Sequence, residues 1–158
     1  MEHMKTKILG LSLAFCVLAG TACLAADPQM GTWKLNEAKS KIAPGTAKFI
    51  TMAFKNTFGN IKATGDGIDA SGKPMHVEWS GKLDGKDYPV IGDPSGGDTR
   101  SYTKVNDRTL TMTVKKNGKV IVTARTVVAA DGKGRTATIS GTTAKGKKFK
   151  NIAFYDRT

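Results

Sequence analysis

Short turn signals recur along this chain at intervals that leave no room for a helix of several turns. Most of them combine glycine with a small polar residue, which suits the backbone of a tight turn. They fall at Asp69–Gly72, Asp84-Gly85, Asn106-Asp107, Asn117-Gly118, Asp131-Gly132 and Lys145-Gly146. Asn-Gly between two alternating segments is the strongest of these signals, because both residues tolerate the positive φ of a two-residue hairpin.

The segments between the turns alternate apolar and polar residues, and a period of two indicates half-buried strands. Nine or ten short strands are expected, from these segments: Gly31–Asn36, Ala47–Lys55, Phe58–Thr64, Met75–Leu83, Asp87–Ile91, Arg100–Val105, Thr109–Lys115, Lys119–Ala129, Arg135–Thr142 and Phe149–Asp156. Hairpins between sequence neighbours predict an all-β fold, a single up-and-down antiparallel β-barrel of about eight to ten strands. Closing the barrel removes the unpaired edges that an open sheet would expose.

The first residues have the layout of a secretory signal peptide. Lys5 and Lys7 precede an apolar segment, Ile8–Ala19, and small residues follow it. Such a segment is too short for a membrane anchor and is removed on export. We therefore expect a signal peptide at residues 1–26, cleaved after Ala25 or Ala26, a barrel domain at 27–158, and a periplasmic or secreted location. The alternative is cleavage before Cys23 with lipid anchoring through that cysteine.

No catalytic or metal-binding group is apparent in the predicted mature chain. Both cysteines, Cys16 and Cys23, lie in the predicted signal region, and His76 is the single histidine that follows it. Transition-metal sites need three or four converging ligands. Ser95 lacks the glycine two positions earlier that a nucleophile elbow requires. We expect neither a metal nor a cofactor, and a protein that is not an enzyme.

The charge is concentrated in the second half of the chain. Residues 27–103 hold ten Lys/Arg against nine Asp/Glu, a net charge of +1, whereas residues 104–158 hold thirteen against three, a net of +10. Many of these cations lie at hairpin tips or beside them and are expected to form a basic rim: Lys115, Lys116, Lys119, Lys133, Arg135, Lys145, Lys147, Lys148 and Lys150. No nucleic-acid partner is expected, because no aromatic residue is interleaved with Lys115–Lys148.

The Gly31-Thr32-Trp33 triplet on the first expected strand resembles the G-x-W signature of lipocalins and the wider calycin group. The resemblance implies that Trp33 closes one end of the barrel and that Arg157 packs across its indole. The region from Gly31 to Tyr155 also resembles small exported bacterial proteins described as lipocalin-like, which have no settled function. It shares with them the GTWKLN opening, the DASGKP turn and the GKDYPV segment.

These features favour an exported, non-enzymatic and monomeric binding protein, whose barrel encloses a small apolar or amphipathic molecule, acidic ones included. The expected pocket residues lie on the apolar faces of the central strands: Met75, Val77, Trp79, Leu110, Met112, Val120 and Val122. Arg125 has two interpretations, a partner for a ligand carboxylate or a solvent-facing sheet residue. The alternative function is a cell-envelope module whose basic half, Lys104–Thr158, contacts anionic lipid or polymer.

Overall fold

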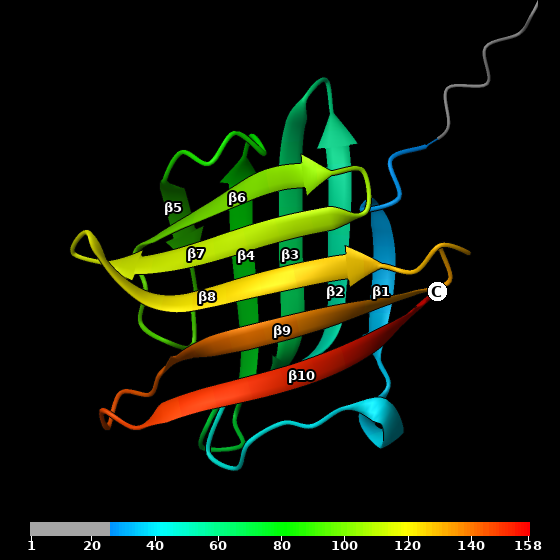
Figure 1. Ribbon diagram of the computed structural model, residues 1–158. Helices are drawn as coiled ribbons and strands as arrows, with labels where there is room; N and C mark the ends of the chain where they lie inside the picture. The colour runs from blue at the N-terminus through cyan, green and yellow to red at the C-terminus, as the bar shows by residue number, and fades with distance from the viewer. Residues whose placement is uncertain (1–25) are drawn as a thin grey trace, which may run out of the picture.

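The computed structural model describes residues 26–158 of the chain, and these form one closed antiparallel barrel of ten strands (Figure 1). The predicted all-β, up-and-down fold is therefore confirmed. The predicted signal peptide up to Ala25, with Cys16 and Cys23, lies outside the described residues. The strands are β1 (Gly31–Leu35), β2 (Lys48–Thr57), β3 (Asn60–Ile68), β4 (Pro74–Gly81), β5 (Tyr88–Ile91), β6 (Thr99–Asn106), β7 (Thr109–Lys116), β8 (Lys119–Val128), β9 (Gly134–Thr142) and β10 (Lys148–Arg157).

Each strand pairs with its sequence neighbours, and β1 closes the barrel by pairing with β10, where Trp33 stands opposite Arg157. In Figure 1, β6–β10 run crosswise in front of β1–β5, so the core lies between two layers of one continuous sheet. A single 3-10 turn, Glu37–Lys39, is the helical part of residues 26–158, and no helix there is long and apolar enough to cross a membrane.

Strand direction divides the connections between two ends. The connections 36–47, 69–73, 92–98, 117–118 and 143–147 lie at one end, which we call the open end. The segment 26–30 and the connections 58–59, 82–87, 107–108 and 129–133 lie at the other, which we call the closed end. The predicted hairpin at Asn117-Gly118 is present, with φ of 48° and 77° at its two residues.

The expected strand Phe58–Thr64 is displaced in the structure. Phe58 and Gly59 form the β2–β3 turn, with φ of 51° and 83°. The strand that follows continues to Ile68 instead of ending at Thr64. Gly65 lies within that strand, at a position where a Cβ would meet the Phe49 ring at 2.7 Å. The glycine therefore permits a close approach between β2 and β3 rather than a turn.

The strand β5 is the weakest part of the barrel wall. It forms two residue pairs with β4 (Glu78↔Ile91 and Trp79↔Val90) and two with β6 (Tyr88↔Arg100 and Pro89↔Thr99). By comparison, β9 and β10 are matched over nine residue pairs. Pro89 has no N–H to donate to a neighbouring strand. The barrel is closed at β5 by few backbone contacts.

Candidate functional site

The interior of the barrel contains a cavity of about 190 Å³. The connecting segments that line it all belong to the open end, and among them are Thr46, Asp93 and Thr143. Its walls are mainly apolar side chains that project inward from β7, β8 and β9: Leu110, Met112, Val114, Val122, Ala137 and Ile139. The cavity is thus a cup with its mouth at the open end.

Three of the expected pocket residues, Leu110, Met112 and Val122, line this cavity. Val77 and Trp79 do not line it, and both are packed in the core with 1% of each exposed. The Trp79 ring packs edge-on against Tyr102, with 4.7 Å between ring centroids. Met75 lies near the open end of β4, half-buried and away from the cavity lining. The β4 wall is filled where an open pocket had been expected.

The expectation that Val120 faces the interior is wrong, since 48% of this residue is exposed. The register of β7 against β8 shifts by one residue, so that Val114 pairs with Val122 but Lys115 pairs with Val120. The extra residue is a β-bulge, which interrupts the alternation of faces. Arg125 is exposed and absent from the cavity lining, in agreement with its solvent-facing interpretation.

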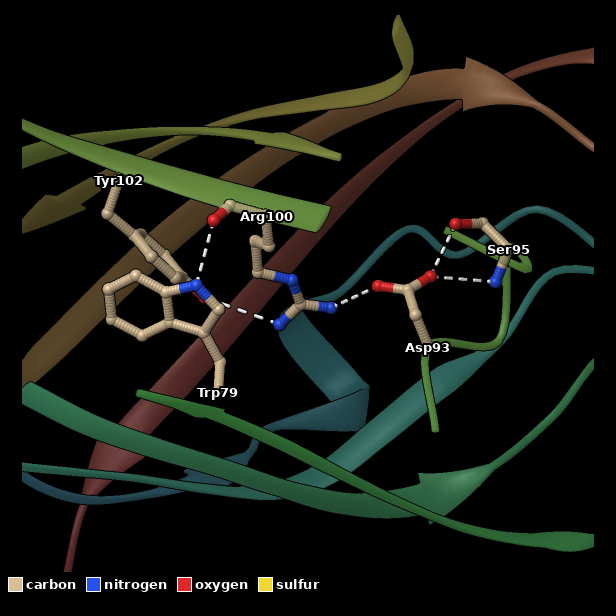
Figure 2. Close-up of polar contacts among 5 residues, drawn as sticks. All are labelled: Trp79, Asp93, Ser95, Arg100 and Tyr102. Carbon is tan, nitrogen blue, oxygen red and sulfur yellow. Dashed lines mark hydrogen bonds and ion pairs between the residues drawn. The ribbon is translucent and has the colours of Figure 1, made fainter. Parts of the chain in front are cut away.

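Arg100, at the start of β6, is one of two buried arginines that line the cavity. Its Nη2 donates to Asp93 Oδ2 at 2.5 Å, and its Nη1 donates to the Tyr102 hydroxyl at 3.4 Å. Figure 2 shows this network, in which the Arg100 carbonyl also accepts a bond from Trp79 Nε1 at 2.8 Å. Arg100 therefore has its counter-charge within the protein.

Asp93 comes from the loop 92–98, and its side chain is 2% exposed in its ion pair with Arg100. Its other oxygen, Oδ1, accepts bonds from the backbone N–H of Ser95, at 2.9 Å, and from the Ser95 hydroxyl (Figure 2). Burial acts to lower the pKa of Arg100, but Tyr102 and Asp93 together raise that pKa above its ordinary value. The loop is thus tied to the mouth of the cavity by a buried ion pair, in which Arg100 Nε is the donor without a partner among residues 26–158.

Arg135, at the start of β9, is the second buried arginine, with 4% exposed. The expectation that it belongs to the basic rim is wrong, because its side chain lines the cavity. The guanidinium carbon lies 4.8 Å from the ring centroids of Trp33 and Phe54 and 5.4 Å from that of Tyr155. In residues 26–158 no carboxylate forms an ion pair with it: its Nη2 reaches Met52 Sδ at 3.3 Å, and its Nε has no partner.

Burial shifts the pKa values of Arg135 and of the neighbouring Tyr155. Removal from water lowers the pKa of Arg135 to about 10, so the side chain still carries its charge at neutral pH. Burial also raises the pKa of Tyr155 to about 12, and the nearby Arg135 offsets part of that rise. The cavity therefore ends on a positive charge beside an un-ionised phenol.

The closed end lies behind this arginine and is sealed by the first and last strands. Trp33 is fully buried, its Nε1 donates to the Gln29 carbonyl at 3.4 Å, and the Arg157 guanidinium lies 4.1 Å from its ring centroid. Arg157 also donates to the carbonyls of Gly132, Met30 and Pro28 at 2.6–2.7 Å. We refer to Trp33, Arg157 and the segment 26–30 as the floor.

The two tyrosines near the loop 92–98 in sequence have different places in the structure. Tyr102 is buried and lines the cavity. Tyr88 is at the closed end, where its hydroxyl donates to Asp84 Oδ2 at 3.1 Å.

A comparison of the chain with models of protein families found no match, and neither did a comparison with curated proteins.

Proposed function

We propose that this protein is a non-enzymatic binding protein that holds a small apolar or amphipathic molecule inside its barrel. The observation that carries the proposal is the cavity of about 190 Å³, which has apolar walls and opens at one end. It is smaller than the cavities of about 300–1,000 Å³ that hold drug-sized ligands. Since an apolar cavity of about 150 Å³ takes up benzene, a ligand of about ten non-hydrogen atoms is a suitable size.

The proposed setting is outside the cytoplasm. It rests on the basic and apolar pattern of the first residues, Lys5 to Ala19, which is typical of a secretory signal. The barrel is also typical of binding proteins that enclose a ligand.

The first test is native mass spectrometry of the protein purified from its own host. We expect a retained small molecule, and its mass would identify the ligand class. A second test compares uptake of an apolar fluorescent probe by two variants of neighbouring residues on β8. Ala124→Phe fills the cavity, which Ala124 lines, whereas Thr123→Phe adds the same ring at an exposed position. Probe binding should fall in Ala124→Phe alone; equal binding by both folded variants would contradict the proposal.

A second candidate function is attachment of the open end to an anionic surface. Five exposed lysines flank two turns at this end: Lys116, Lys119, Lys145, Lys147 and Lys148. Exposed charges act through the solvent and are screened by salt over about 10 Å at 0.1 M. Binding to anionic vesicles that disappears in high salt, with no retained apolar molecule, would favour this function over the first.

A further inference from the structure

We propose that Arg135 binds the anionic head group of a small amphipathic monoanion, for which a carboxylate is the most suitable group. The head group lies at the floor of the barrel and the apolar tail extends toward the open end. This inference rests on the proposed function, because it requires that the cavity holds a ligand. It assigns the acidic head to the bottom of the cavity rather than to the basic rim.

The contrast with Arg100 provides the first support. Both arginines are buried and both line the cavity. Arg100 is neutralised by Asp93, from the loop above it. Arg135 forms no ion pair with any carboxylate of residues 26–158, although an isolated buried charge is strongly unfavourable. A ligand anion would supply the missing counter-charge.

The aromatic rings around Arg135 hold the guanidinium without satisfying its donors. Trp33, Phe54 and Tyr155 present their rings to it at 4.8–5.4 Å, which stabilises the charge. A guanidinium nevertheless carries five N–H groups. The one acceptor found for it, Met52 Sδ, is a weak one, and Nε has no acceptor. The two oxygens of a carboxylate match this fork of donors.

The size and charge of the site limit the class of ligand. One unpaired arginine balances one negative charge, and a buried dianion such as a phosphate monoester would leave a charge uncompensated. The walls above Arg135, including Leu110, Met112 and Ile139, are apolar and suit a short hydrocarbon tail. A short-chain carboxylate satisfies both requirements.

The experiment compares three probes with the same alkyl chain and different head groups: octanoate, 1-octanol and octylammonium. Their affinities for the wild-type protein are measured at pH 7 by calorimetry. We expect octanoate to bind about 10- to 100-fold more tightly than octanol, as is typical of hydrogen bonds to a charged group. Octylammonium should bind most weakly. Equal affinity for octanoate and octanol would overturn the inference but leave the proposed function standing; failure of all three to bind would overturn both.

The variants Arg135→Met, Arg135→Lys and Arg125→Met test the residue itself. Arg135→Met keeps an unbranched apolar stem and removes the charge, so the preference for octanoate over octanol should disappear while octanol still binds. Arg135→Lys keeps a charge without the fork and should retain part of the preference. Arg125→Met, on the exposed face of β8, should bind like the wild type. A preference that persists in Arg135→Met would overturn the inference.

A measurement on the wild-type protein keeps the test decisive if Arg135→Met does not fold. The arginine Nε–H signals are followed by NMR during titration with octanoate and with octanol. We expect the Arg135 signal to move on addition of octanoate and much less on addition of octanol. An Arg135 signal that octanoate leaves in place would contradict binding at this residue.

Discussion

Arg100 and Arg135 are both buried in the barrel, and only Arg100 has a carboxylate beside it. An arginine placed in a low-dielectric interior is costly unless its charge and its N–H groups are matched. Asp93 supplies the counter-charge of Arg100 from within the chain, although Arg100 Nε, like Arg135 Nε, has no acceptor among the described residues. Within residues 26–158, Arg135 lacks a counter-charge and acceptors for all of its N–H groups, and we propose that the ligand supplies them.

The Asp93–Arg100 pair should be essential for stability. Asp93→Asn removes the carboxylate and leaves the buried guanidinium of Arg100 without its counter-charge. Breaking a buried ion pair in this way costs about 3–5 kcal/mol. Urea denaturation should show a fall of that order in the free energy of unfolding. Ser95→Ala removes one hydrogen bond to the same carboxylate and should cost about 1 kcal/mol; equal losses in the two variants would contradict the assignment.

His76 should titrate above its usual pKa. Hydrogen bonds from its ring to Asp66, at 2.6 Å, and to Glu78, at 3.1 Å, favour the protonated form and raise the pKa above 6.5. Because the folded pKa is the higher one, the stabilisation is complete below the unfolded value near 6.5 and is lost as pH rises through the folded pKa. An NMR titration measures this value directly. In Asp66→Asn the pKa should move back toward 6.5; an unchanged pKa would exclude Asp66 as its main cause.

The alternating pattern predicted well which strands exist and in what order, but it predicted poorly the local register between neighbouring strands. Asn117-Gly118 and the alternation of β7 predicted the turn of one hairpin and the positions of its two strands. The bulge beside Val120 could not be predicted, because it depends on how two strands meet across the sheet. The strand expected to end at Thr64 continues through Gly65 for the same reason, since the role of this glycine is defined by the ring of Phe49 on the neighbouring strand.

The position of Arg135 was within reach of the sequence. It lies two residues before Ala137 and four before Ile139, so a period of two places Arg135 on the same face as these two apolar residues. Proximity to a turn suggested the rim instead. That preference for charged residues at the surface is correct for most arginines and fails at this one.

Two strand glycines allow a matched test of the close approach between β2 and β3. Gly65→Ala places a methyl group against the Phe49 ring, whereas at Gly134 the nearest atom to a new Cβ is the Tyr155 carbonyl oxygen at 3.4 Å. Overpacking costs about 1–3 kcal/mol. We expect thermal and urea denaturation to show a loss of this size for Gly65→Ala and little change for Gly134→Ala. Equal stability of the two variants would show that Phe49 moves aside freely.

For the whole molecule, the sequence predicted the barrel but not the shape of its interior. Whether such a barrel is hollow depends on how side chains from opposite walls meet, and Val77 and Trp79 show that one wall is filled where the pattern suggested a pocket. Those side chains share the same apolar alternation as Leu110 and Met112, which line the cavity. An alternating pattern indicates on which face of the sheet a side chain lies, but it does not indicate which side chains face it across the barrel.

The short pairing of β5 gives the closed barrel a place where it opens first. Regions with few backbone hydrogen bonds and few buried contacts have the lowest free energy of local unfolding. Amide hydrogens of β5, residues 88–91, should therefore exchange faster than those of residues 134–157, where β9 and β10 are matched over nine residue pairs. Hydrogen-exchange mass spectrometry measures the difference, and uniform protection around the barrel would contradict it. Arg100 borders this seam, so its ion pair with Asp93 adds a side-chain link between β6 and the loop 92–98 at the place where backbone pairing is shortest.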